Sequence, residues 1–314
     1  PAADSDVRFV TEAHARLSQT FSVLLPDWHK LRWAVDKGLA YQHAAELGLA
    51  VPQIYHITSL AEAETATLQF PVVLKPAMRL TRNRFTQDKA WRADDRAQFI
   101  ARYSDAADLV GAENIVVQEL VPGGGDCQFS YAGLWNHGRP VLGFTARRTR
   151  QYPIEFSYTS TFVETADAPD VRAAAERFLA AIGHHGLVEI EYKRDPRSGA
   201  LKLLDINPRP WSWFALAEAA GIDFGAGIAA MARGTPVAPA TARPGIGWIF
   251  LMRDLVVGFK LTTAGALGWG DYLRSLRQVR AFASFSWRDP LPGLIELPLT
   301  AFRVLSRLLS RFSR

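Results

Sequence analysis

The stretch GLVEIEYKRDPRSGALKLLDINPRPW, residues 186–211, decides how this sequence folds. Two runs rich in apolar residues, 186–195 and 200–207, flank a turn that contains Pro196 and Gly199. Short alternating runs on either side of proline and glycine are the pattern of a β-hairpin. We therefore expect two paired strands here, each with one face turned to the core and one face carrying polar side chains.

The polar face of this hairpin is acidic. Successive side chains of a strand point to opposite faces, so Glu189 and Glu191 share a face, and Asp205 and Asn207 share a face of the second strand. Oxygen ligands without histidine or cysteine at ligand spacing suit Mg²⁺ or Mn²⁺ holding phosphates. Arg209, just past the second strand, is a fixed cation that could lie against a transferring phosphoryl group.

A simpler interpretation is a solvated strand face, on which the acids pair with Lys193, Arg194 and Lys202. Two details count against it. Asn207 is neutral and so has no role in a set of ion pairs. The prolines on either side of Arg209 stiffen the backbone, which would fix the direction of this arginine.

The whole chain of 314 residues, 48% of them apolar, indicates a mixed α+β protein. Residues 7–26 suggest a strand, a helix and a second strand. Further along we expect helices at 36–52, 93–109 and 170–182, and strands at 70–76, 114–121, 128–136 and 140–148. Hairpin strands outnumber crossovers, which favours antiparallel sheets over a doubly wound parallel sheet. The two standard glycine-rich nucleotide loops are absent.

Taken together, the motifs GLVEIEYKRD, LLDINPRPW and the following FALAEAAGIDF resemble the C-terminal half of the ATP-grasp fold. The signature of that family is an acid, a second acid about fourteen positions on, and then N-P-R. Here Glu191 and Asp205 have this spacing. The resemblance extends over about residues 26–245. It implies two α+β subdomains with antiparallel sheets that clasp ATP, and activation of a carboxylate as an acyl-phosphate for attack by an amine.

The resemblance also implies which residues bind the nucleotide. Lys75, at the end of VVLKP, and Lys37, in DKG, match cations that reach the phosphates. The segment 114–121 resembles the hinge strand, in which Glu119 matches the acid that accepts from the adenine amino group and backbone groups near Val121 reach the ring edge. Asp126 matches the acid that holds the ribose hydroxyls.

By the same resemblance, Glu191, Asp205 and Asn207 would hold two Mg²⁺ ions, and Arg209 would steady the acyl-phosphate. Many relatives have a glycine-rich lid where this chain has PAMRLTRNRFTQDKAWR, residues 76–92, which contains no glycine. Cationic side chains could replace the backbone amides there: Arg79, Arg82, Arg84 and Lys89. This departure leaves a nucleotide-binding protein with weak or no catalysis as an alternative.

Residues 144–164 occupy the position where family members bind the acceptor substrate. Arg150, beside Gln151 and Tyr152, suits a small carboxylate or phosphate, although a charged edge strand that resists aggregation explains the pattern nearly as well. The loop sequences most resemble a branch of carboxylate-amine ligases, or carboligases, that includes D-aspartate ligase.

Three units are expected from these patterns. Residues 1–35 would be a remnant of the α/β domain that precedes the ATP-grasp domain, because the chain opens at Pro1 as a trimmed piece would. Residues 36–245 would form the ATP-grasp domain, and residues 246–314 a C-terminal extension.

The formal net charge of +5 comes mostly from residues 299–314, which hold four arginines and no acid. A general nucleic-acid surface is therefore poorly supported. Arg303, Arg307 and Arg311 recur every four residues with leucines opposite, the pattern of a basic amphipathic helix that lies on an anionic membrane. A helix packed on the core with a solvated arginine face is equally compatible.

A single cysteine, Cys127, and the absence of a signal peptide favour a cytoplasmic location, at the inner face of the membrane if the tail binds there. The sequence thus supports a ligase first. An ATP-binding protein with weak or no catalysis, peripheral to the membrane and acting in an envelope pathway, comes second. A peripheral membrane protein with a merely structural hairpin comes third.

Overall fold

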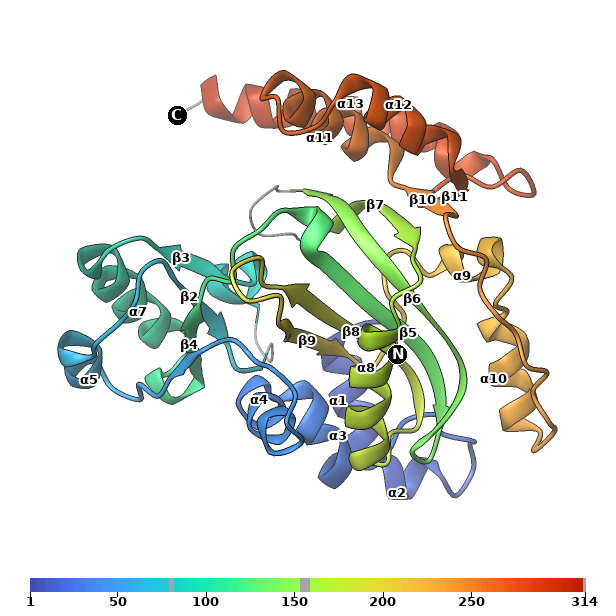
Figure 1. Cartoon of the computed structure of the whole chain (residues 1–314), viewed down its shortest axis with the longest axis horizontal. Helices are drawn as coiled ribbons and strands as arrows, with labels where there is room; N and C mark the ends of the chain where they lie inside the picture. Colours follow the sequence, from blue (N-terminus) through green and yellow to red (C-terminus); the bar gives the residue numbers. More distant parts are fainter. Residues whose placement is uncertain (79–81, 153–158, 313–314) are drawn as a thin grey trace.

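The structure is a computed structural model that describes residues 1–78, 82–152 and 159–312. Two sheets lie side by side, a smaller one and a larger one (Figure 1). The smaller sheet is antiparallel, and its strands follow the order β1 (Ile54–Tyr55), β4 (Ile115–Glu119), β2 (Val72–Pro76) and β3 (Trp91–Ala93). Its flanking helices are α5 (Leu60–Thr65), α6 (Arg84–Asp88) and α7 (Arg96–Val110). Phe99 and Tyr103 of α7 are fully buried in the core that these elements share.

The larger sheet has seven strands and forms the centre of the molecule. Their order is β11 (Val279–Phe282), β10 (Gly247–Ile249), β7 (Thr159–Thr165), β6 (Arg139–Tyr152), β5 (Gln128–Asn136), β8 (Gly186–Arg194) and β9 (Leu201–Asn207). All neighbours are antiparallel except β10 and β11, which are parallel. The hairpin expected from the sequence is therefore present as β8 and β9, at one edge of this sheet.

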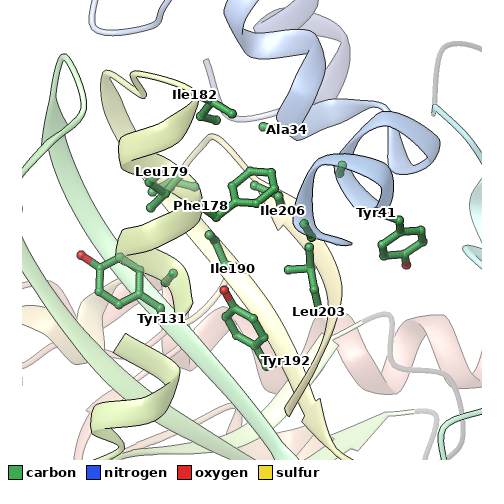
Figure 2. Packing of buried hydrophobic residues seen from close by; sticks show 14 of the residues in the cluster. Ala34, Tyr41, Tyr131, Phe178, Leu179, Ile182, Ile190, Tyr192, Leu203 and Ile206 are labelled. Atoms are coloured by element: carbon green, nitrogen blue, oxygen red, sulfur yellow. The ribbon is translucent and has the colours of Figure 1, made fainter. Parts of the chain in front are cut away.

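A core on one face of the larger sheet joins it to helices α1 (Asp4–Glu12), α3 (Trp28–Val35), α4 (Lys37–Glu46) and α8 (Pro169–Ala181). The short helix α2 (His14–Leu17) contributes no buried residue. Figure 2 shows Phe178 and Leu179 of α8 close to Ile190 and Tyr192 of β8. These two β8 residues alternate with Glu189 and Glu191, which therefore lie on the other face.

A second core covers the opposite face, because Tyr131 and Trp135 of β5 belong to the first core and Ala132 and Leu134 to the second. Helices α9 (Ala215–Ala220) and α10 (Phe224–Ala232) pack there. Helices α11 (Leu251–Thr263), α12 (Trp269–Arg277) and α13 (Leu291–Phe312) lie together at one end of the molecule (Figure 1).

The α+β class and the antiparallel sheets expected from the sequence are confirmed. The expected strand, helix and strand in residues 7–26 are wrong, because α1 and α2 occupy this region. Val7 and Thr11 lie one helical turn apart and are both buried, so the apolar residues of this segment form a helical face instead of a strand. The expected C-terminal extension also contributes β10 and β11 to the larger sheet.

Candidate functional site

The acidic face of the β8–β9 hairpin brings its oxygen atoms together. The strand register places Glu189 opposite Asn207 and Glu191 opposite Asp205. The Asn207 amide nitrogen donates to a carboxylate oxygen of Glu189 and to one of Glu191, both at 3.3 Å. The convergence expected from strand alternation is thus present. We call Glu189, Glu191, Asp205 and Asn207 the acidic cluster.

Glu189 is the most buried carboxylate of the acidic cluster. It accepts a hydrogen bond of 3.0 Å from the Ser130 hydroxyl, and only 4% of its surface is exposed. Burial, reinforced by the nearby negative charge of Glu191, raises the pKa of Glu189 to about 7. Arg148 offsets only part of this effect. Glu189 therefore carries a charge that the protein compensates incompletely.

Three cations surround the acidic cluster. The Lys37 ammonium bonds to Asp205 at 2.7 Å, the Arg148 guanidinium bonds to Glu191, and Arg209 donates to the Asn207 oxygen at 3.1 Å. Burial alone would raise the pKa of Glu191, but the charge of Arg148, helped by Lys89, outweighs burial and lowers it. Burial would also lower the pKa of Arg209, but Asp4 of α1, which accepts a hydrogen bond from Arg209, reverses this and raises it.

Local sequence features place these cations. Asp36 caps α4 by accepting from the Leu39 amide at 3.1 Å, which fixes Lys37 at the first position of the helix. Lys89 ends α6 with a positive φ of 63°, a conformation uncommon for residues other than glycine. The lid without glycine thus directs one lysine charge toward the acidic cluster. Arg79 lies outside the described residues.

The alternative of a solvated strand face is wrong for this hairpin. Lys202 pairs with Glu119 and Asp195, and Arg194 pairs with Asp170 at 2.6 Å, so neither cation serves the acidic cluster. Glu189 and Asn207 are buried.

Glu119, expected to accept from adenine, has other partners. Its carboxylate accepts from the Gln53 amide at 2.9 Å and from Arg197 at 2.6 Å, and it also pairs with Lys202. Arg197 and Lys202 also bond to Asp195. Because Glu119 ends β4 and Lys202 lies in β9, this network joins the two sheets. Beside it, the Tyr41 hydroxyl donates to the Leu204 carbonyl at 2.8 Å.

A cavity of about 590 Å³ lies next to this junction. Val121 and Asp126 line it, as do Lys193 and Gln151. The glycine loop that carries Asp126 lies directly on β6: a Cβ at Gly125 would come within 2.2 Å of the Thr149 carbonyl oxygen, so only glycine fits. Val121 and Asp126 are therefore brought together in a hollow large enough for a small ligand.

Lys75 is the next-to-last residue of β2 in the smaller sheet, where it pairs with Val116 of β4. Arg150, expected to bind the acceptor, lines the same cavity as Val121 and Asp126, but its guanidinium has protein partners. Its guanidinium donates twice to Asp254, at 2.8 and 2.9 Å, and once to Ser275 at 3.0 Å, and both charged groups are almost fully buried. The structure therefore gives Arg150 a partner from α11 and does not bring it to the acidic cluster.

Two residues of the site had not been singled out as site residues from the sequence. Glu189 had a signal, since strand alternation placed it beside Glu191, whereas nothing local marked Arg148 as the partner of Glu191. Figure 2 shows that Ile206, whose neighbours are Asp205 and Asn207, lies in the core beneath the hairpin, as expected.

The donor atoms of the acidic cluster suit a hard divalent cation, since all are carboxylate or carboxamide oxygens. Within the part of the chain that the structure describes, however, no group of three or more acidic, histidine or cysteine side chains is arranged to hold a metal ion. Lys37 and Arg148 form ion pairs with Asp205 and Glu191 in this cluster. A metal ion bound to these carboxylates would have to displace Lys37 from Asp205 and Arg148 from Glu191.

No protein-family model matches the sequence, and no curated protein sequence is similar to it. Solved structures with the same fold do exist. The biotin carboxylase domain of 2-oxoglutarate carboxylase from Hydrogenobacter thermophilus, in complex with MgADP, ADP and bicarbonate, is 13% identical with a TM-score of 0.62, over 78% of this chain and 55% of that one.

An L-amino acid ligase from Bacillus licheniformis is 16% identical with a TM-score of 0.58, over 78% of this chain and 65% of that chain. The N5-carboxyaminoimidazole ribonucleotide synthetase from Thermus thermophilus is 17% identical with a TM-score of 0.56, over 74% and 61%. The chain thus spans less than two thirds of the length of these structures. Its fold, two α+β units built on antiparallel sheets, is the ATP-grasp fold.

Proposed function

We propose that this protein is an ATP- and Mg²⁺-dependent ligase that activates a carboxylate as an acyl-phosphate and joins it to an amine. The observation that carries the proposal is the acidic cluster, four oxygen-bearing side chains converging on adjacent strands with Lys37, Arg148 and Arg209 around them. Similar folds solved with MgADP or described as amino acid ligases support it.

In this proposal the acidic cluster holds the metal ions, with Glu191, Asp205 and Asn207 as expected from the sequence and Glu189 added from the structure. Mg²⁺ would supply charge neutralisation at the phosphates. The raised pKa of Glu189 supports its inclusion, because incompletely compensated negative charge favours a bound cation.

The nucleotide would lie between the two sheets. Val121 and Asp126 line the cavity that fits the base and ribose, and we assign the adenine edge to backbone groups near Val121, since the Glu119 carboxylate already has three partners. Lys75 and Lys89 would bind the phosphates. Lys37 would bind them as well once a metal ion has taken its place at Asp205.

The chemistry follows from this placement. A carboxylate oxygen of the substrate attacks the γ-phosphorus and ADP leaves, and then the amine nitrogen attacks the acyl carbon and phosphate leaves. The protein's part is positioning and charge stabilisation. Arg209, which donates to Asn207 at 3.1 Å and also bonds to Asp4, would stabilise the acyl-phosphate in this scheme. Arg150 is left out of this scheme because Asp254 binds it.

The loops that resemble carboxylate-amine ligases such as D-aspartate ligase make D-aspartate the first carboxylate to test. The assay is ADP release across a panel of carboxylates and amines, with Mg²⁺ and with chelator. We expect release that depends on substrate and metal, and none from Asp205→Asn. Asp271→Asn, which changes an exposed carboxylate on α12, serves as the matched control. Equal ADP release from Asp205→Asn would contradict the proposed metal site.

A second candidate function is nucleotide binding with weak or no catalysis. The ion pairs of Lys37 with Asp205 and Arg148 with Glu191 favour it, because they close the acidic cluster in the absence of ligand. Calorimetric ATP binding without ADP release from any pair in the panel would support this function over the ligase.

We further propose that the protein works in the cytoplasm at the membrane, in contact with anionic lipid through residues 299–314. Among the described helices, none has the length and apolar character needed to cross a bilayer. The helix expected here is present within α13, which runs from Leu291 to Phe312. Localising a tagged chain by cell fractionation, with and without residues 299–314, tests this part.

A further inference from the structure

Exposed apolar side chains gather on the three C-terminal helices. Among the described residues, sixteen large hydrophobic side chains are exposed, and twelve of them lie between Leu251 and Phe302. Helices α11, α12 and α13 lie together at one end of the molecule, beyond the edge of the larger sheet (Figure 1). Contiguous apolar surface of this kind marks an interaction site.

The exposed residues follow the helical repeat on each helix. On α11, Leu251, Leu255 and Phe259 recur every four residues, which places them on one face. On α12, Trp269 and Leu273 have the same spacing. The Phe259 and Trp269 rings lie 6.4 Å apart between centroids, so the apolar faces of α11 and α12 join.

Helix α13 repeats the pattern. Its exposed apolar residues again have the spacing of one helical face. Leu294 and Ile295 lie three and four positions after Leu291, and Phe302 lies seven positions after Ile295. Trp287, just before this helix, is 89% exposed and packs edge-on against Phe285 at 5.0 Å. We call the exposed apolar residues from Leu251 to Phe302 the C-terminal apolar surface.

The charge of the protein is concentrated in the same segment. Residues 251–314 contain ten Lys and Arg against four Asp and Glu, which leaves 26 against 27 for residues 1–250. One of the four acids, Asp254, is fully buried against Arg150, and another, Asp271, pairs with Arg274 at 2.6 Å. The entire positive excess of the chain therefore lies in the segment that carries twelve of the sixteen exposed large apolar side chains of the described residues.

We propose that the C-terminal apolar surface docks the protein onto an anionic lipid bilayer, with α11, α12 and the start of α13 lying in the interface. Amphipathic helices with basic residues beside apolar faces bind this way, and tryptophans such as Trp269 and Trp287 favour the depth of the headgroups. The proposal widens membrane contact from the tail to a folded surface, and it does not depend on the ligase activity.

Charge complementarity favours a bilayer over a second copy of the chain. Self-association through this surface would bring the net positive segment of one copy against that of another, and like charges across an interface oppose binding. Anionic headgroups attract the same residues, each basic side chain near the surface strengthening binding about fivefold.

The test is co-flotation of the full chain with vesicles of phosphatidylcholine alone or mixed with phosphatidylglycerol. We expect flotation with the anionic vesicles that weakens as salt is raised. The variant carrying both Phe259→Glu and Trp269→Glu should lose it. The variant with Arg274→Glu and Arg277→Glu should bind about 25-fold more weakly from the loss of two cations, and the two new anions should weaken binding further. Phe21→Glu, which changes an exposed apolar residue between α2 and α3, is the matched control and should float like the wild type.

A chain ending at Pro298 lacks the tail, and Leu299 and Phe302 with it, but keeps the rest of the C-terminal apolar surface on α11, α12 and the start of α13. If deletion of the tail abolishes flotation while Phe259→Glu with Trp269→Glu floats normally, the proposal is overturned. Leu255→Glu repeats the test on α11 without the Phe259–Trp269 contact, and circular dichroism checks that each variant folds.

Two further experiments test whether lipid or a second copy of the chain covers the C-terminal apolar surface. Brominated lipid should quench the fluorescence of Trp269 and Trp287, so replacing each with Phe should reduce the quenched fraction. Two results together would refute membrane docking: the wild type sediments as a dimer that the variant with Phe259→Glu and Trp269→Glu does not form, and the wild type does not bind anionic vesicles. They would show that a second copy of the chain covers the C-terminal apolar surface.

Discussion

The substitution Glu189→Gln tests whether the acidic cluster carries incompletely compensated charge. Glutamine has the same shape, and it can accept from Asn207 while donating to the Ser130 hydroxyl, which can also accept. Burial and Glu191 raise the pKa of Glu189 from its ordinary value of 4.5 to about 7. The variant therefore removes one titrating carboxyl group and changes the packing little.

The sign of the effect follows from proton binding. Between pH 4.5 and 7 the folded protein keeps a proton on Glu189 that the unfolded chain has released, so wild-type stability falls as pH rises through this window. A shift of this size corresponds to about 3 kcal/mol. Relative to the wild type, Glu189→Gln should thus gain up to about 3 kcal/mol of unfolding free energy between pH 4 and pH 8.

Urea denaturation of both proteins across this range measures the difference. Glu176→Gln, on the outer helix α8, controls for the loss of a carboxylate. With Mg²⁺ and a nonhydrolysable ATP analogue the gain should vanish or reverse, because a bound cation compensates the charge that Glu189 carries. A difference that stays flat from pH 4 to pH 8 without ligand would refute the reasoning.

Further predictions concern the other charged groups. Asp254→Asn leaves the Arg150 guanidinium buried without its carboxylate and should lower the unfolding free energy by about 3–5 kcal/mol in urea denaturation; a loss below 1 kcal/mol would contradict the buried pair. Arg197 holds the pKa of Asp195 well below its usual range, so the advantage of the wild type over Asp195→Asn should be fully present at neutral pH and decline progressively as pH falls below about 4. Asp126→Ala should weaken ATP binding about tenfold in calorimetry without changing stability, and unchanged affinity would remove Asp126 from the proposed ribose site.

Local patterns predicted much of the fold. Asp36 caps α4, and the alternation in residues 186–207 correctly divides core residues from acidic ones. The N-terminal segment failed because a short apolar run fits either a strand or a helix, and its burial against α3 decides the outcome. Strand β10 could not be predicted, since its three residues form a strand by pairing with β7 and β11, which are distant in sequence.

The acidic cluster was predictable in part for the same reason. Strand alternation within one hairpin identified the faces of Glu191, Asp205 and Asn207. The cations that bind them come from distant segments: Lys37 lies 168 positions from Asp205, and Arg148 reaches Glu191 across β5. Pairings of this kind depend on the packed sheet, so no local spacing reveals them.

The network around Glu119 has a mechanical consequence. Because Glu119 and Lys202 join β4 to β9, this edge of the smaller sheet is held against the larger sheet. Glu119 stands opposite Val72, and Lys75 lies three residues farther along β2, roughly 10 Å from Val72. A rotation of the smaller sheet about this edge would displace Lys75 more than Val121, and it would have to break the hydrogen bond of 3.3 Å that the Lys37 amide donates to the Ala77 carbonyl.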